Sequence, residues 1–303
     1  MNSASLVDDF AARVVDANPI HASFMRKSLK GMREDTRKEL TDYLDYGLSL
    51  GLDLTYLALC YNTIVNDIRT EQIYFSEHGH YRWSRFADLA NDVYFNAEYM
   101  RKYMYGLAIT SFLWPNHVAL HDFFVRTFPR DRTGTYLEIG PGHGYYFMQA
   151  AQLGNFDRLI GVDISEASVA LTRDIVRHFG IDKRGHAEII QKDFFTFNDG
   201  DEAYSCIVMG EVLEHVEEPA PFVAKLAKLS GPQTHVFLTT CMNAAAIDHI
   251  SLFRTGKEVE DILTSNGFAI VESEYVPYLG KTLAECEAAA LPVNVAYVLR
   301  KVA

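Results

Sequence analysis

Residues 135–147 read TYLEIGPGHGYYF and combine a short apolar run with a glycine-rich break. The run carries one acid, Glu138, and the break places glycines at every second position, Gly140, Gly142 and Gly144. Glycine leaves out a side chain where the backbone turns sharply or approaches a ligand. In open α/β sheets, ligands bind beyond the carboxyl ends of the strands, and the first strand is a usual contributor. The stretch therefore predicts a first strand followed by a ligand-binding turn.

The sequence differs on the two sides of this stretch. From it onward, β-rich apolar runs alternate with helical segments, which is typical of βαβ units in a parallel sheet with helices on both faces. Residues 1–130 instead show helical spacing and little strand-like alternation. We expect an all-helical N-terminal region over 1–130 and an α/β domain over 131–303, joined at the polar PRDRTG, residues 129–134. The expected strands are TYLEIG (135–140), RLIGVDI (158–164), AEIIQKDF (187–194), SCIVMGEV (205–212), HVFLTTC (235–241), FAIVESEYV (268–276) and NVAYVLRKV (294–302).

Composition limits the classes of function. A chain of 303 residues with 49% hydrophobic content can bury a substantial core. The 22% charged and 13% aromatic residues argue against disorder. A formal net charge of −12 argues against a main activity that depends on attraction to nucleic acid or to an anionic membrane.

The cysteines and the N-terminus indicate a cytoplasmic protein. Cys60, Cys206, Cys241 and Cys286 lie far apart without a CxxC pair, so we expect buried free thiols rather than disulfides or a zinc ribbon. The start, MNSASLVDDF, lacks the basic and apolar regions of a secretory signal. No apolar run approaches the roughly 20 residues that cross a bilayer, so no membrane partner is expected.

The glycine spacing does not fit a dinucleotide. The GxGxxG fingerprint brings a pyrophosphate to a helix N-terminus, but here the third glycine comes too early and Phe147 stands three residues after Gly144. Glu138 also stands where a phosphate would be repelled. A carboxylate at this position suits a ligand that carries a cationic amine.

The next two expected strands end in residues suited to a nucleoside. Asp163 can accept hydrogen bonds from both ribose hydroxyls, and Ile164 can pack on the base. Asp193 can accept from an exocyclic amine, and Phe194 can cover the ring. An amine, a ribose and an adenine without phosphate describe S-adenosylmethionine (SAM).

Four motifs then carry a family resemblance. LEIGPGHG (137–144), GVDIS (161–165), QKDFF (191–195) and IVMGEVLEHVEEP (207–219) resemble, in order, the motifs of class I SAM-dependent methyltransferases. The resemblance covers about residues 133–303. It implies SAM as the cofactor and a Rossmann-like seven-stranded mixed sheet, in which the last strand lies antiparallel beside the penultimate one. It also implies that the helical half caps the acceptor pocket and that NHVALHDFF (116–124) lies against the cofactor.

Candidate catalytic residues follow the fourth expected strand. Glu211, Glu214 and His215 would share a helical face if a helix begins there. Asp248 and His249 should lie on the same rim, just after the fifth strand. We expect Glu211, His215 and His249 to act as bases or to position the acceptor. The tyrosines of the helical half are expected in the core more often than in the pocket.

A metal site is an open alternative. The pattern E-x-x-E-H resembles two metal-using branches, the methyltransferases of small-RNA 3′ ends and the ubiquinone-pathway O-methyltransferases. By that resemblance Glu211, Glu214 and His215, with His249, could hold one Mg²⁺, Mn²⁺ or Zn²⁺. The segment LEHV also recurs in metal-free members, so no metal ligand is assigned.

The favoured function is methyl transfer from SAM to a small-molecule metabolite, in a biosynthetic or secondary-metabolite pathway. Oxygen is slightly favoured over nitrogen, sulfur or carbon as the methylated atom. No nucleic-acid partner is expected, and amphipathic N-terminal helices would allow a homodimer. A non-catalytic SAM-binding or partner-binding protein and a nicotinamide-dependent oxidoreductase are the alternatives.

Overall fold

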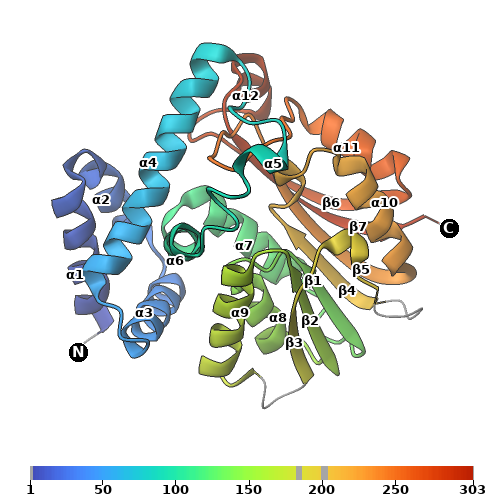
Figure 1. Ribbon diagram of the computed structural model, residues 1–303, viewed down its shortest axis with the longest axis horizontal. Coiled ribbons are helices and arrows are strands. Elements are labelled where there is room, and N and C mark those ends of the chain that lie inside the picture. Colours follow the sequence, from blue (N-terminus) through green and yellow to red (C-terminus); the bar gives the residue numbers. More distant parts are fainter. Residues whose placement is uncertain (1–2, 182–185, 199–203, 303) are drawn as a thin grey trace.

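The strands form one seven-stranded mixed sheet, as predicted. The structure is a computed structural model that describes residues 3–181, 186–198 and 204–302. The strand order is β3-β2-β1-β4-β5-β7-β6, and only β7 runs antiparallel to its neighbours (Figure 1). The strands are β1 (Thr135–Ile139), β2 (Arg158–Asp163), β3 (His186–Gln191), β4 (Tyr204–Gly210), β5 (Ser230–Met242), β6 (Phe268–Pro277) and β7 (Val293–Lys301). The antiparallel last strand beside the penultimate one confirms the Rossmann-like mixed sheet.

The two faces of the sheet pack against different helices. Because successive side chains of a strand point to opposite faces, Tyr136 and Leu137 of β1 belong to different hydrophobic cores. The Tyr136 face packs against α7 (Pro115–Thr127), α8 (Tyr145–Leu153) and α9 (Glu166–His178). The Leu137 face packs against α10 (Pro219–Leu229) and α11 (Gly256–Ser265).

The N-terminal half is all-helical. Its longest helix, α4, has 25 residues; the Asp53 side chain caps its start by accepting from the Tyr56 amide, and Gly79 ends it at φ 73°. In Figure 1 this helix runs the length of the helical half and ends near α12. The helices here are α1 (Ser3–Ala17), α2 (Ala22–Gly31), α3 (Glu34–Ser49), α4 (Leu54–His78), α5 (Phe86–Leu89) and α6 (Ala97–Leu113).

The sequence analysis did not predict α12 (Leu283–Ala289). This helix begins with a capping box, in which the side chains of Thr282 and Glu285 each accept from the other's backbone amide. No single described helix has the length and apolarity to cross a bilayer; α3 and α4 meet that criterion only as a pair bent by 117°.

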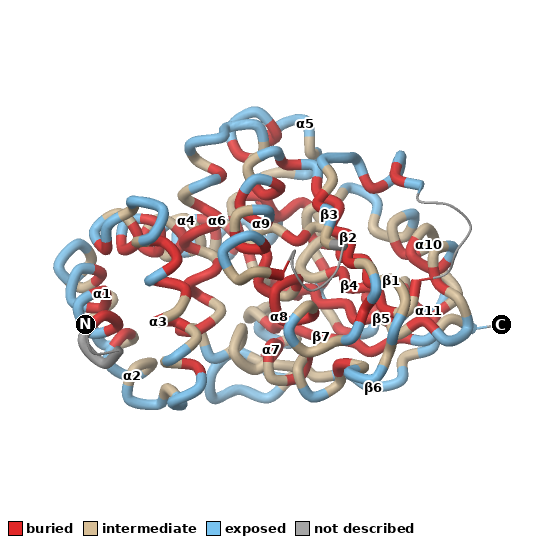
Figure 2. The backbone as a smooth tube through the Cα atoms, turned by 90° about the horizontal axis from the view of Figure 1, so that it is seen from below, coloured by how far each residue is buried: buried red, intermediate tan, exposed pale blue. Residues whose placement is uncertain are grey.

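One hydrophobic core joins the helical half to the sheet. Phe123 and Phe124 of α7 pack against Phe237 of β5, with ring centroids 6.0 and 5.0 Å apart. The same core continues into α1, α3, α4 and α6, and the buried segments in Figure 2 run through both halves. The helical half is therefore fixed over the carboxyl ends of β1 and β4 by packing.

Candidate functional site

A cavity of about 1480 Å³ lies where the helical half meets the carboxyl edge of the sheet. Its floor is formed by the turns that follow β1, β2, β3, β4 and β5. Its walls come from one face of α4 and from α6 and α7. Each predicted cofactor-binding and catalytic residue except Gly144 lines this cavity: Glu138, Gly140, Gly142, Asp163, Ile164, Asp193, Phe194, Glu211, His215 and His249.

The glycine turn after β1 needs glycine for conformational reasons. Gly140, Gly142 and Gly144 have φ values of 67°, 53° and 76°, a region that side chains disfavour. A Cβ at Gly140 would also lie 2.9 Å from Val212. Gly144 lies behind the turn, where its Cα faces Thr172 of α9. The first two glycines thus keep backbone open to the cavity, and the third starts α8.

Glu138 is a buried carboxyl without a cationic partner among the described residues. Its side chain lies on the same sheet face as Tyr136, whose hydroxyl donates to Oε2 at 2.5 Å. Burial raises the pKa of Glu138 to about 8, and the nearby charge of Asp163 adds to the effect. The ammonium group of a ligand would favour the ionised carboxylate. This fits the amino-acid end of SAM.

The raised pKa of Glu138 predicts how stability depends on pH. Folded protein holds this proton up to about pH 8, whereas unfolded protein loses it near pH 4.5, so stability falls as the pH rises through that window. Between pH 7 and 8 we expect the ligand-free protein to lose about 1 kcal/mol of unfolding free energy through Glu138. Urea denaturation at the two pH values measures the change.

The matched control is Glu138→Gln, which mimics the protonated side chain and lacks this titration, so between pH 7 and 8 the unsubstituted protein should lose about 1 kcal/mol relative to it. The comparison also cancels the effect of the buried histidines, which act in the opposite direction. Burial lowers the pKa of these histidines to about 4, so each adds about 0.1 kcal/mol of stability between pH 7 and 8 as the unfolded imidazole loses its remaining protons. These histidines are His117, His121, His143, His235 and His249. An equal change in unfolding free energy between pH 7 and pH 8 in the unsubstituted protein and in Glu138→Gln would contradict the assignment.

Asp163 holds the glycine turn and keeps acceptor capacity for a ligand. Oδ2 accepts from the Gly142 amide at 3.1 Å, and Oδ1 accepts from the Ser165 amide at 2.8 Å. Burial raises its pKa to about 6, while these amides lower it, so the group is ionised at neutral pH. A carboxylate has about four lone-pair sites. The remaining acceptor capacity is available to ribose hydroxyls, and that contact stays a prediction.

The residues predicted to contact the adenine lie at the cavity, but a different phenylalanine ring is exposed there. Ile164 is 36% exposed at the cavity, so it is free to pack on a ring. Phe194 is buried beneath the Lys225 ammonium, 4.8 Å from its ring centroid. The more exposed ring is that of Phe195, which is 47% exposed and packs edge-on against Phe222. Sequence reasoning missed these two rings, although the doubled phenylalanine after Asp193 was a signal.

No helix begins at Glu211, so the condition for a shared helical face is not met. Glu211 has φ 51°, and only a short 3-10 turn, η4 (Leu213–His215), follows it. A left-handed residue cannot belong to a right-handed helix, so the shared helical face does not exist. The carboxyl groups of Glu211 and Glu214 nevertheless meet in a hydrogen bond, and burial raises the pKa of both. The pair therefore holds a proton more tightly than exposed carboxyls do.

Glu211 is also linked to the helical half through two amides that the sequence did not reveal. Asn116 of α7 donates to Asn294 Oδ1 at 2.8 Å, and Asn294 Nδ2 lies 3.5 Å from Glu211 Oε2. The two asparagines lie 178 positions apart in the chain, so no local pattern connects them. They connect the carboxyl group of Glu211 to α7 and β7, and all three residues line the cavity.

His215 lies beside Asp248, as expected for residues on one rim. Its Nδ1 donates to the main-chain oxygen of Asp248 at 3.0 Å. The Asp248 carboxylate accepts from the hydroxyls of Tyr94 and Tyr103, each at 3.2 Å. The sequence analysis expected these two tyrosines in the core. Through Asp248 they connect the helical half to the segment that carries His249.

His249 is neutral and lies next to His215. Burial lowers its pKa to about 4, and its Nδ1 donates to the Ala244 carbonyl at 2.6 Å. The ring centroids of the two histidines are 4.9 Å apart. With both Nδ1 protons donated to main-chain oxygens, the Nε2 atoms carry the lone pairs.

The described residues contain two groups of potential metal ligands, and both include His249. One group consists of Glu214, Cys241 and His249. The other consists of His215, Asp248 and His249. Within each group the ligand atoms lie within 4.8 Å of one another. Glu211 belongs to neither group. The ligand set that the resemblance implies is therefore only partly brought together, and Cys241 stands in the group instead.

Comparison with known proteins supports the family resemblance. A family model described as "Methyltransferase domain" matches residues 116–273, more than half of the chain. No curated protein sequence matches the chain.

Among solved structures, the (4+2) cyclase SpnF superposes with a TM-score of 0.50 at 16% identity, covering 60% of this chain and 80% of its own. The cyclopropane synthase MmaA2 from Mycobacterium tuberculosis gives 0.50 at 14% identity, covering 62% and 85%. At these identities the likeness shows the fold alone. The branch of O-methyltransferases is not identified by these matches.

The family match includes α7, the glycine turn and the strands whose ends carry Glu138, Asp163, Asp193 and Glu211. It removes the alternative of a nicotinamide-dependent oxidoreductase. The chain belongs to the methyltransferase domain family and is a class I methyltransferase with S-adenosylmethionine as its cofactor.

Proposed function

We propose that the chain methylates a small-molecule metabolite, preferentially on oxygen, in a biosynthetic or secondary-metabolite pathway. The proposal is supported by the volume of the cavity and by the elements between which it extends. Its volume of about 1480 Å³ exceeds the roughly 300–1000 Å³ of a typical small-molecule site. It continues from the glycine turn to α4 and α6, so cofactor and acceptor can occupy it together.

The wall opposite the cofactor end suits a largely apolar acceptor with a polar group. Val65, Ile68 and Ile73 present apolar side chains from α4. Arg69 and Gln72 lie on the same stripe, and Gln72 accepts from the Ala245 amide beside the catalytic rim. Because helices enclose this wall, a small molecule fits better than a nucleic acid or a protein chain.

The residues of the rim can support the transfer without a dedicated acid. When bound, SAM supplies a methyl group on a sulfonium centre whose departure needs no protonation. The carboxyl group of Glu211, with its pKa raised by burial beside Glu214, is suited to accept the proton of an acceptor hydroxyl. His215 and His249 can position that hydroxyl through Nε2. The surrounding apolar wall excludes water, which strengthens these interactions.

A labelled-methyl assay tests the proposal. Pools of phenols, alcohols, amines and keto acids are incubated with the full chain and SAM carrying a radioactive methyl group, with RNA and denatured protein as competing acceptors. We expect label in a small molecule, on an oxygen atom. Label in RNA or protein overturns the acceptor class. Tight binding of S-adenosylhomocysteine without turnover of any pool favours the non-catalytic alternative.

A further inference from the structure

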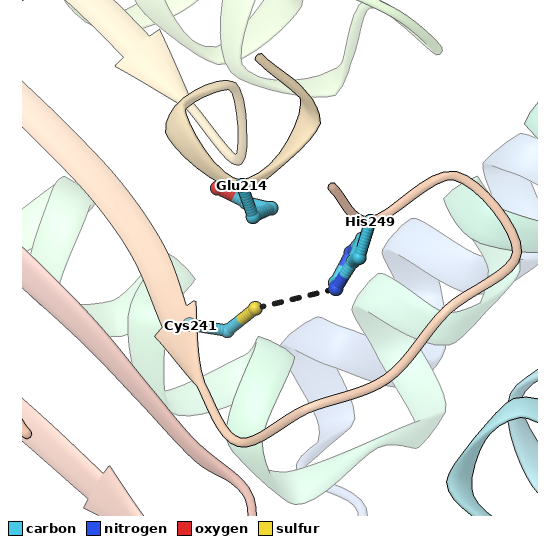
Figure 3. Close-up of side chains that lie close together, drawn as sticks. All are labelled: Glu214, Cys241 and His249. Atoms are coloured by element: carbon cyan, nitrogen blue, oxygen red, sulfur yellow. Dashed lines mark hydrogen bonds between the residues drawn. The ribbon is translucent and has the colours of Figure 1, made fainter. Parts of the chain in front are cut away.

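Glu214, Cys241 and His249 form a compact buried group, in which the methyl-transfer proposal gives Cys241 no role. Glu214 comes from the turn η4, Cys241 from the end of β5, and His249 from the loop before α11 (Figure 3). Their exposed fractions are 0%, 1% and 9%. Three different side-chain chemistries, carboxylate, thiol and imidazole, thus meet at one point.

The spacing of this group fits a tetrahedral ion. A zinc ion about 2.3 Å from sulfur and about 2.0–2.1 Å from nitrogen holds those two atoms about 3.6 Å apart at a tetrahedral angle. Cys241 Sγ and His249 Nδ1 are 3.7 Å apart, joined by the dashed line in Figure 3. The ligand atoms of all three residues lie within 4.8 Å of one another, so modest side-chain rotations complete the geometry.

Two further observations fit a cation at this group. Glu214 Oε1 is fully buried and bonds no donor among the described residues, so it is satisfied only while the Glu211–Glu214 pair holds a proton. The other oxygen, Oε2, accepts from Thr240 at 2.8 Å. The charged groups that act on the Cys241 thiol are all acids, Glu214, Glu211 and Asp248. A cation would take the place of the proton that the carboxyl pair holds and would offset the negative charge of these acids.

We propose that Glu214, Cys241 and His249 bind a thiophilic divalent cation, with zinc as the best fit. A thiolate ligand disfavours Mg²⁺ and Ca²⁺, which prefer oxygen. Binding releases the thiol proton to solvent. It also moves the imidazole proton from Nδ1, where it now bonds the Ala244 carbonyl, to Nε2.

The ligand set differs from the oxygen and imidazole set that the resemblance implies, because Cys241 replaces Glu211. Cys241 and His249 both line the cavity, so the fourth position of the ion can take water or an oxygen atom of the acceptor. The proposal concerns binding of the ion and does not depend on the identity of the acceptor.

Metal content and cobalt spectroscopy test the proposal on the full chain. After loading with zinc chloride and gel filtration, we expect one zinc per chain by elemental analysis. Cobalt(II) loading should give the intense near-ultraviolet band of sulfur-to-cobalt charge transfer. Cys241→Ser should abolish the band and weaken zinc binding by at least about tenfold, since serine is a poor ligand at neutral pH. Cys286→Ser, another buried thiol, is the matched control and should match the unsubstituted protein.

The outcomes are decisive either way. Absence of bound zinc in the folded, unsubstituted protein overturns the site, and so does a charge-transfer band that persists in Cys241→Ser. Unchanged zinc affinity in Cys241→Ser overturns the thiolate assignment. Circular dichroism checks folding; if Cys241→Ser does not fold, His249→Gln replaces it, with loss of zinc expected and retention counting against the site.

Discussion

Replacement of Asp163 by alanine is expected to weaken binding of S-adenosylhomocysteine about 100-fold, since hydrogen bonds to a charged group contribute about 1.5–3 kcal/mol each. The loss has two sources. The carboxylate can no longer accept the ribose hydroxyls, and the Gly142 amide loses its acceptor, which frees the glycine turn. Isothermal titration calorimetry with the purified chain measures the affinity directly.

A second aspartate gives the matched control. Asp157 also accepts from a glycine amide, that of Gly134 at 2.8 Å, but at the opposite end of β1 and β2. Asp157→Ala should therefore leave the affinity for S-adenosylhomocysteine unchanged. If Asp163→Ala binds as tightly as the unsubstituted protein while remaining folded, the carboxylate does not contact the ribose.

Replacement of His215 by alanine is expected to lower kcat about 100-fold with the acceptor that the labelled-methyl assay identifies, the size of loss that a misplaced reacting group can cause. His215 lies on the cavity with Nδ1 bonded to the Asp248 main chain, so its Nε2 is available to the acceptor. Binding of S-adenosylhomocysteine should not change, because the cofactor contacts belong to β1, β2 and β3. Steady-state kinetics and calorimetry separate the two effects.

His178→Ala serves as the control for this substitution, because His178 lies exposed at the end of α9, outside the cavity. It should retain full kcat. A purely structural role of His215 would lower the melting temperature and cofactor affinity together. If kcat is unchanged in His215→Ala, His215 does not position the acceptor hydroxyl.

The sheet could be predicted because its signals are local. The central strands β1, β2 and β4 are apolar runs that end at or just before an acid or a glycine, and residues near those ends, such as Glu138 and Asp163, line the cavity. The short helix α12 could also have been found, since Thr282 and Glu285 stand at capping-box spacing.

The methyl-transfer side of the site was harder to predict, because packing rather than sequence spacing assembles it. Tyr94 and Tyr103 reach Asp248 across 154 and 145 positions. The left-handed backbone of Glu211 could not be predicted from its residue type, because glutamate rarely adopts this conformation. Cys241 looked like any isolated cysteine until the loop before α11 brought His249 beside it.

The shared core of α7 and β5 also bears on how new acceptor specificities arise in this protein. Removing or exchanging residues up to α7 would expose Phe123, Phe124 and Phe237 to water, so a transplanted lid must keep α7 with the recipient's own sheet. Substitutions along the cavity-facing stripe of α4, at Ile68, Arg69 or Ile73, leave that junction intact. Directed evolution of this enzyme should therefore proceed by point changes on α4 rather than by recombination of whole halves.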